Sequence, residues 1–339
     1  MATRGRLAIL RKPPSCDEPM QAPDDSTVCP VCGPGDREPE LRDERTGIEL
    51  VRCAGCGLVF QAEQPTDAEL ADAYADFYAR PGKRFGSVVE SAVARFRDSR
   101  ARMATRLTVA GGRVLDVGCG RGAFLAAMQR RGFRVRGTEF SEAAAANVAL
   151  AGVEIDVGEL APGMYADASF DLVCIWHVLE HCRRPDRTLR ATRDALVPGG
   201  ALMVAVPNYD SLQARWSKTA WFHLDLPRHL YQFTPATLAR LLADAGFRVE
   251  SLRTGQWEMD PFGILQSALN RAGFRHNALY DALSANPHVR RRVPAPWRVA
   301  AWAVLAAGMV LAVPAAAVER ALGRAGTIVV VARAESAAD

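Results

Sequence analysis

The sequence predicts an α/β protein built on a doubly wound, largely parallel sheet. Residues 113–122, Arg-Val-Leu-Asp-Val-Gly-Cys-Gly-Arg-Gly, are typical of a buried strand that ends in a glycine-rich turn and opens a helix, Ala123 to Arg131. The next strand, Arg134 to Thr138, is followed at once by an acidic residue, Glu139. Strands and helical segments continue to alternate after it, which is the order of a parallel sheet with helical crossovers.

The glycine turn indicates a nucleoside cofactor. Glycines let the backbone approach a ligand closely and leave the helix N-terminus open to it, and the carboxylate of Glu139 can accept both ribose hydroxyls. Gly118, Gly120 and Ala123 also satisfy the looser dinucleotide pattern. Asp116, however, stands two residues before the first glycine, where a carboxylate repels a pyrophosphate. It suits the cationic methionine end of S-adenosyl-L-methionine (SAM), so the sequence favours SAM over NAD.

Three motifs taken together resemble the class I SAM-dependent methyltransferases. They are LDVGCGRG at 115–122, FDLV with HVLEH within 170–181, and LVPGG with VPN within 196–208. The resemblance covers residues 111–256. It implies SAM-dependent methyl transfer on a Rossmann-like, doubly wound sheet of seven strands, and a Rossmann-like domain without methyl transfer is the alternative.

The resemblance also implies how the last strands are arranged and which residues hold the cofactor. Phe247 to Arg253 is expected as the sixth strand, with Thr327 to Ala332 inserted antiparallel beside it. Glu159 follows the third strand, Val153 to Val157, at the position where the family places an acid near the adenine amine. Tyr74 lies in a helical lead-in at 63–110 that covers the pocket, and a plain packing role is its alternative. The expected cofactor-binding residues are Asp116, Gly118, Gly120, Gly122, Glu139, Glu159 and Tyr74.

Four of the six histidines fall in two loops at the predicted ligand-binding edge of the sheet. Histidine titrates near neutrality and suits removal of a proton from an acceptor hydroxyl during methyl transfer. An orienting or capping role is the alternative for each one. His181 and His229 are the first candidates for the base, with Asp225 or Glu180 orienting it; Glu180, His181 and Asp225 could instead hold a divalent cation. The candidate catalytic residues are His181, His229, His177, His223 and Asp225.

Two Cys-x-x-Cys pairs near the N-terminus predict a structural zinc site. Cys29, Cys32, Cys53 and Cys56 have the spacing of a tetrahedral four-thiolate centre, and the segment between the pairs suits a short hairpin. A pair of redox dithiols is the alternative, but the segment lacks a thioredoxin-like context. Residues 28–62 are therefore expected to form a zinc ribbon that binds Zn²⁺.

The ribbon carries six acidic residues and four arginines, which is a poor electrostatic footprint for nucleic acid. No nucleic-acid partner is therefore expected. An N-terminal ribbon before this catalytic fold resembles sugar and surface-glycan methyltransferases, which implies O-methylation of a small-molecule saccharide or a lipid-linked saccharide hydroxyl. The alternatives are a quinone-type or other small-molecule O-methyltransferase, a sugar C-methyltransferase, a nucleic-acid methyltransferase guided by the ribbon, and a non-enzymatic protein that retains a SAM pocket.

An apolar helical insertion is expected at 257–323, before the last strand at 324–335. Its segment Val299 to Val318 is long enough to span a bilayer and has no charged residue. One crossing would, however, separate the last strand from the sheet. The open alternatives are peripheral contact with the inner face of the membrane, with arginines on anionic headgroups, and burial against the catalytic domain or in a dimer.

Composition sets the remaining expectations. A length of 339 residues allows one large domain with smaller additions, and an apolar fraction of 49% allows a sizeable core. The catalytic domain is expected at 111–256. Residues 1–27 contain no apolar stretch of signal-peptide length and are expected to be a disordered tail. A cytoplasmic location follows from this expectation, with eight cysteines that do not form a disulfide framework.

Overall fold

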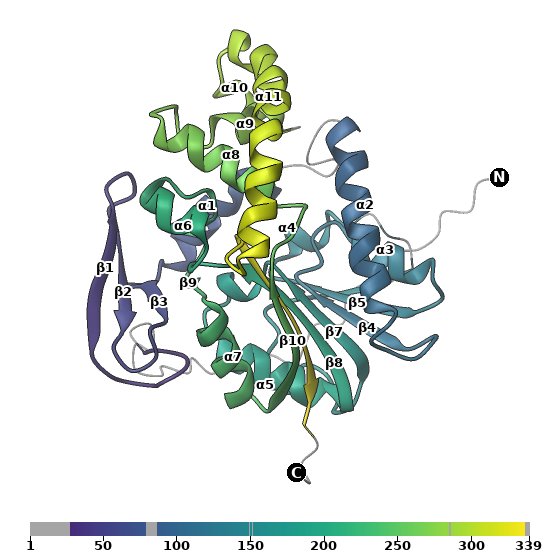
Figure 1. Cartoon of the computed structure of the whole chain (residues 1–339). Coiled ribbons are helices and arrows are strands. Elements are labelled where there is room, and N and C mark those ends of the chain that lie inside the picture. The colour runs from purple at the N-terminus through teal and green to yellow at the C-terminus, as the bar shows by residue number, and fades with distance from the viewer. Residues whose placement is uncertain (1–27, 79–86, 149, 151, 285, 336–339) are drawn as a thin grey trace, which may run out of the picture.

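The fold is a seven-stranded mixed sheet covered by helices on both faces, as expected for a Rossmann-like class I methyltransferase fold (Figure 1). A computed structural model describes residues 28–78, 87–148, 150, 152–284 and 286–335. The expected tail at 1–27 lies outside the described residues. The strand order is β10-β11-β8-β7-β4-β5-β6, and only β11 runs antiparallel to its neighbours. The seven strands are β4 (Arg113–Val117), β5 (Arg134–Glu139), β6 (Glu154–Val157), β7 (Phe170–Trp176), β8 (Leu196–Pro207), β10 (Phe247–Thr254) and β11 (Thr327–Ala334).

Side chains that alternate along the central strands build two cores, one on each face of the sheet. Val114 and Leu172 pack beneath α2 and α3, whereas their neighbours Leu115 and Val173 pack beneath α5 and α7. All four side chains are fully buried. Burial on both faces explains the continuous apolar runs of these strands. The helices of this domain are α1 (Asp67–Tyr78), α2 (Ser87–Ala104), α3 (Ala123–Gln129), α4 (Glu142–Ala145), α5 (Pro185–Ala195), α6 (Leu212–Ser217) and α7 (Pro235–Asp244).

The cysteine-rich segment forms a small sheet that includes a strand of the catalytic domain. Its own strands are β1 (Arg37–Asp43), β2 (Ile48–Cys53) and β3 (Val59–Gln61), and β3 pairs with β9 (Tyr231–Gln232). β9 directly follows the second histidine loop. The ribbon and that loop are therefore joined by backbone hydrogen bonds at one edge of the molecule (Figure 1).

The insertion between β10 and β11 is helical, with α8 (Asp260–Arg271), α9 (Ala278–Leu283), α10 (Pro287–Arg291) and α11 (Ala295–Ala321). Among the described residues, α11 is the one helix long and apolar enough to cross a bilayer by length and composition. β10 and β11 nevertheless pair along their whole lengths. Both ends of the insertion therefore return to the same edge of one sheet.

Candidate functional site

The glycine turn connects β4 to α3 and leaves open space at its centre. Gly118, Gly120 and Gly122 have φ values of 63°, 60° and 74°, in the left-handed region that favours glycine. A β-carbon at Gly118 would come within 2.6 Å of Val178, whereas one at Gly120 would have no atom within 4 Å. Gly120 therefore borders the cavity directly, and Gly118 is required for close packing of the turn.

This turn forms one end of a cavity of about 1400 Å³. The cavity extends along the carboxyl ends of the parallel strands to the two histidine loops and to helices of the insertion. All of the residues expected at the cofactor and at the acceptor line it, except for Gly122. A β-carbon at Gly122 would instead come within 2.8 Å of Val148, so this glycine allows close packing behind the turn.

Asp116 lies at the floor of the cofactor end, 2% exposed. Burial raises the pKa of its carboxyl to about 6, against the opposing charge of Arg100. The Arg100 guanidinium stacks 4.3 Å over the ring of Phe124 and 5.2 Å over that of Trp176. Its Nε is buried without a hydrogen-bond partner among the described residues. A guanidinium and a carboxylate side by side fit the carboxylate and amine of a methionine moiety.

Arg100 was not predicted from the sequence. It lies on α2, thirteen residues before β4 begins at Arg113, in a helix whose arginines otherwise resemble a solvated surface. No local pattern distinguishes it from Arg102, which pairs with Asp98 on the same helix. Only the packing of α2 on α3 carries Arg100 into the cavity.

Two carboxylates line the cofactor end where the ribose and the adenine are expected. Glu139 is 3% exposed and accepts a hydrogen bond from the Gly120 amide. Burial raises its pKa to about 7, the amide of Gly120 opposes this rise, and the nearby charge of Asp116 adds to it. Glu159 lies on the cavity wall at the end of β6 and remains open to solvent. The residues present therefore fit SAM at this end.

All four loop histidines line the opposite end of the cavity, and two of them face each other. The rings of His181 and His229 lie 4.6 Å apart in an edge-to-face arrangement. His181 Nδ1 donates to the carbonyl of Arg228 at 2.9 Å, and His229 Nδ1 donates to the carbonyl of His223 at 2.8 Å. A carbonyl can only accept a hydrogen bond, so Nδ1 carries the proton and Nε2 keeps a lone pair in both neutral rings.

The other two histidines have different surroundings. His177 Nε2 contacts Gln256 Oε1 at 3.0 Å, and Nδ1 lies 3.3 Å from Glu180 Oε1. Burial lowers the pKa of His177, but the Glu180 carboxylate outweighs burial and raises this pKa above its ordinary value. His223 is 4% exposed, and burial lowers its pKa to about 3. His177 is thus an ion-pair partner of Glu180. His223 has a neutral ring, and its backbone carbonyl accepts the hydrogen bond from His229.

Glu180 lies beneath the pair of histidines and is completely buried. Neither of its carboxylate oxygens has a hydrogen bond of good geometry in the described part of the chain. Ligand atoms of Glu180, His181 and His229 lie within 4.8 Å of one another, so these three groups could hold a divalent cation. The grouping differs from the expected one, because His229 takes the place of Asp225.

Asp225 instead forms an ion pair with the next loop residues. Its carboxylate lies 2.6 Å from the Arg228 guanidinium and 3.6 Å from His229 Nε2. Although burial alone would raise it, the charges of Arg228 and His229 hold the pKa of Asp225 far below its usual range. Asp225 thus places a carboxylate beside His229 Nε2 at the acceptor end.

Tyr74 is placed between the two ends of the cavity. Its hydroxyl lies 2.9 Å from His181 Nδ1, and its ring contacts Phe140, directly after β5, at 5.2 Å between centroids. The residue thus contacts the acceptor-end histidine and also borders the cofactor end. The prediction that Tyr74 contacts the cofactor stays a prediction.

The ribbon contacts the second histidine loop, which contains His229, through Gln61 at the end of β3. Gln61 Nε2 donates to the carbonyls of Pro227 at 2.8 Å and of His229 at 3.0 Å. The side chain is 1% exposed. Nothing in the sequence near Gln61 indicates this role, because its partners are more than 160 positions away.

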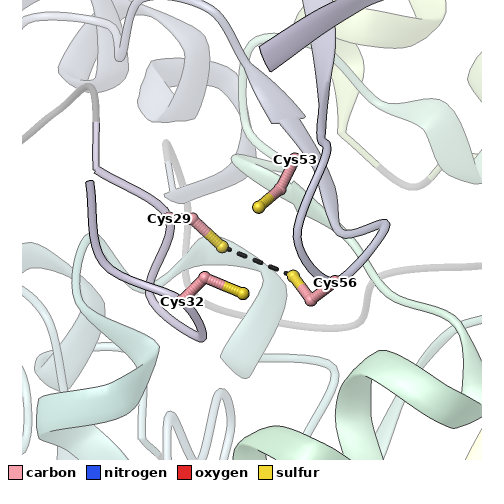
Figure 2. A group of neighbouring side chains, drawn as sticks. All are labelled: Cys29, Cys32, Cys53 and Cys56. Carbon is pink, nitrogen blue, oxygen red and sulfur yellow. Dashed lines mark hydrogen bonds between the residues drawn. The ribbon is translucent and has the colours of Figure 1, made fainter. Parts of the chain in front are cut away.

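The four expected zinc ligands converge at one place in the ribbon (Figure 2). Their sulfur atoms all lie within 4.8 Å of one another, and Cys29 Sγ is 3.6 Å from Cys56 Sγ. Zinc–sulfur bonds of about 2.3 Å in a tetrahedron place sulfurs about 3.8 Å apart. Gly33 and Gly57, which follow the two pairs, adopt φ values of 77° and 78° and turn the backbone around the centre. The group fits a four-thiolate zinc ion.

Comparison with known proteins agrees with this geometry. Residues 89–252 match a family model described as a methyltransferase domain. The chain is 31% identical over 157 residues to the ubiquinone biosynthesis O-methyltransferase of Azoarcus sp. (strain BH72), covering 42% of this chain and 67% of that protein. It is 32% identical over 168 residues to the protein of the same name from Xanthomonas euvesicatoria pv. vesicatoria (strain 85-10), covering 44% and 68%.

Among solved structures, the cyclase SpnF is similar with a TM-score of 0.50 at 20% identity, covering 80% of this chain and 97% of that one. At this identity the likeness concerns the fold alone. The matched family domain begins after the ribbon and ends before α8. The ribbon and the helical insertion are therefore additions to the shared domain.

Proposed function

Because this chain belongs to the class I SAM-dependent methyltransferases, we propose that it methylates a hydroxyl group of a small-molecule acceptor held at His181 and His229. One observation carries the proposal: a single cavity has the glycine turn at one end and, at the other, two histidines whose Nδ1 atoms donate to backbone carbonyls and whose Nε2 atoms can accept a proton. A hydroxyl between them has a methyl donor on one side and a proton acceptor on the other.

At the cofactor end, SAM when bound supplies an electrophilic methyl group. Arg100 and Asp116 would bind the carboxylate and amine of its methionine moiety, and Glu139 would bind the ribose hydroxyls. Glu159 would lie near the adenine. These contacts orient two reactants in one cavity, and such positioning is a large part of catalysis in bimolecular reactions.

At the acceptor end, His229 or His181 would accept the hydroxyl proton at Nε2. Burial, together with the neighbouring His229, lowers the pKa of His181 to about 4, so that His181 is neutral near pH 7 but a weaker base than an ordinary histidine. Asp225 would stabilise the charged form of His229 after the transfer, since its carboxylate lies 3.6 Å from the same nitrogen.

The first acceptor class to test is a phenolic hydroxyl on a ring that carries an isoprenoid tail, because the similar curated proteins are named for ubiquinone biosynthesis. A saccharide hydroxyl is the second. It is favoured by polar side chains that line the acceptor end, namely Gln256, Asn277, Asp281, Ser284 and Asn286. Carboxamide, carboxylate and hydroxyl groups are suited to hydrogen bonds with several adjacent hydroxyls.

The test is formation of S-adenosylhomocysteine from SAM with a panel of acceptors. The panel contains a prenylated catechol, nucleotide-linked and lipid-linked sugars, and each acceptor with the relevant hydroxyl already methylated as the matched control. We expect turnover with an unmethylated hydroxyl acceptor and none with its methylated partner. Product methylated on carbon, or methylation of RNA in place of every small molecule, would contradict the proposal.

We also propose that the ribbon holds one structural Zn²⁺ at Cys29, Cys32, Cys53 and Cys56. The convergence of four sulfurs supports it, since a closed four-thiolate site has no open position for chemistry. Elemental analysis of the purified protein should give one zinc per chain, and Cys53→Ser should lower it. Cys174→Ser is the matched control, because that buried cysteine lies in the catalytic sheet. Absence of zinc from the wild type would contradict the proposal.

A further inference from the structure

Helix α11 has two apolar faces, and only one of them is packed. Its inner face contacts α8 and α9 through a buried cluster that includes Ala301, Ala312, Leu265 and Leu279. Gly308 lies so close to α8 that a β-carbon there would come within 2.4 Å of Leu265. The insertion is therefore a tightly packed helical unit, and its inner face already has its partners.

The outer face of α11 is apolar and exposed to solvent over the length of the helix. Exposed residues recur at the three- and four-residue spacing that defines one side of a helix. The larger ones are Val299 (79% exposed), Trp302 (43%), Val310 (70%), Leu311 (77%), Val313 (42%) and Val318 (56%).

This pattern differs from that of an ordinary surface helix, whose outer face is polar. From Val299 to Val318 there is no charged residue on either face, and the most apolar part of α11 has a mean hydropathy of 2.1 with only 17% of it buried. A continuous exposed apolar stripe of this kind marks a surface that binds a partner or a lipid.

The charges around the stripe indicate which partner it fits. Arg290, Arg291, Arg292 and Arg298 precede the stripe, and no acidic residue lies between Asp281 and Glu319. Arg290 and Arg291 are exposed. An uncharged stripe with tryptophan on it and arginines at one end complements the apolar interior and the anionic headgroups of a lipid leaflet.

The topology decides how such a surface can be used. The helix has 27 residues and is about 40 Å long at 1.5 Å per residue. A crossing of the bilayer would place β10 and β11 on opposite sides, but these strands pair from Phe247–Ala334 to Thr254–Ile328. The inner face is also occupied by α8 and α9. Only the outer face is available, so the helix can lie on a leaflet but cannot pass through it.

We propose that the outer face of α11, with the arginines that precede it, docks the enzyme on an anionic phospholipid surface. The same insertion lines the acceptor end of the cavity with Tyr280, Val289 and Arg292. Docking therefore brings the cavity close to the headgroup layer, where an acceptor with a lipid tail would be met. The docking itself rests on α11 alone and holds for any acceptor.

The test is co-sedimentation of the full-length protein with vesicles of phosphatidylcholine, with or without phosphatidylglycerol, in the absence of SAM and acceptor. We expect binding to the anionic vesicles that weakens between about 0.1 M and 1 M salt, where the screening length falls from about 10 Å to 3 Å. Arg290→Gln combined with Arg291→Gln should reduce binding to the anionic vesicles. Failure of the wild type to bind them would overturn the proposal.

Single charges placed on the outer face of α11 and at an exposed apolar residue elsewhere separate docking through α11 from a general effect of added charge. Leu311→Glu lies on the outer face and should reduce vesicle binding at least about tenfold without lowering the melting temperature. Val109→Glu is the matched control, because Val109 is 67% exposed but lies in the loop between α2 and β4. Its binding should equal that of the wild type.

A second copy of the chain is the competing occupant of the stripe. Sedimentation velocity of the same variants decides between the two. A wild-type dimer that becomes a monomer on Leu311→Glu, with no vesicle binding by either form, would overturn the lipid proposal. Vesicle binding by a monomeric wild type that is lost in Leu311→Glu would support it.

Discussion

The two ends of the cavity are built in opposite ways. The cofactor end is formed mainly by one continuous segment, the strand and glycine turn at 113–122, and by the end of the neighbouring strand at Glu139. The acceptor end is assembled from the loops after β7 and β8, from Gln61 of the ribbon and from Tyr280 of the insertion. The first depends on local backbone geometry, and the second depends on contacts between distant segments.

This difference indicates how substitutions at each end should affect SAM binding and turnover. A strand, turn and helix form most of the cofactor end, within the matched family domain. The acceptor end combines loops of that domain with contacts from parts outside it, the ribbon and the insertion. Changes at the cofactor end should therefore abolish binding of SAM, and changes at the acceptor end should alter turnover while leaving SAM affinity intact.

The largest effect is expected at Gly120. Gly120→Arg would project a long side chain into the open space at the centre of the turn, at a backbone conformation that residues other than glycine rarely adopt. Titration calorimetry should show no SAM binding. Gly132→Arg is the matched control, since that glycine has φ 85° and equally open space but lies outside the cavity. Unchanged affinity in Gly120→Arg would place the cofactor elsewhere.

Replacement of the paired histidines should give the next largest effect. His181→Ala and His229→Ala remove the two candidate bases, and at least one should lower turnover by about 10²–10⁴-fold, the usual range for general-base catalysis. SAM affinity should stay near that of the wild type. His276→Ala is the control, because His276 does not line the cavity. Near-normal rates in both variants would exclude proton transfer to either ring as an important step.

The ionisation of Glu139 predicts a moderate effect of pH on SAM affinity. In the free protein burial raises the pKa of Glu139 to about 7 and that of Asp116 to about 6. The ionised carboxylates bind the ribose hydroxyls and the cationic methionine end, so binding is strongest above these values and weakens as pH falls through them. Affinity should drop up to about tenfold from pH 7.5 to pH 6.

Glu139→Gln provides the control for this pH dependence. The variant should bind SAM more weakly at pH 7.5, by roughly 1.5–3 kcal/mol for a lost charge-assisted hydrogen bond. Its affinity should also change little between pH 7.5 and pH 6.5, and the remaining decline near pH 6 belongs to Asp116. An equally steep profile in the variant would assign the titration to another group.

The smallest effect is expected for the ribbon contact. Gln61→Leu removes two hydrogen bonds to the histidine loop, each worth about 1 kcal/mol, and should lower turnover by about three- to tenfold with unchanged SAM affinity. Gln64→Leu is the matched control, because Gln64 bonds to Tyr231 and to the Arg183 carbonyl rather than to that loop. Equal turnover in the two variants would show that the hydrogen bonds of Gln61 do not influence catalysis at the acceptor end.

Sequence patterns predicted the sheet well because each strand carries its own signal. β5, β6 and β10 each differ from the expected strand by one residue at one end, and β11 begins at the expected Thr327 and ends two residues later. The antiparallel insertion of β11 was expected from the family resemblance and is confirmed by its pairing with β10 and β8. Buried strands need continuous apolar runs, and those are visible in one sequence.

Tertiary contacts explain what the sequence did not predict. Arg100 and Gln61 have ordinary local surroundings. Only helix packing brings Arg100 to the cavity, and only sheet pairing brings Gln61 to the second histidine loop. The histidines were expected at this edge, but the pairing of His181 with His229 depends on carbonyls of Arg228 and His223. The apolar segment was identified from composition, whereas its packed and exposed faces were not distinguishable before α8 and α9 were placed against it.

A crystal structure of the protein with S-adenosylhomocysteine tests most directly whether one cavity joins the methyl donor to a histidine-held hydroxyl. We predict the ribose at Glu139, the amino-acid carboxylate at Arg100, and the sulfur directed along the cavity toward His181 and His229. A ribose bound away from Glu139, or a sulfur directed away from the histidine pair, would contradict this arrangement.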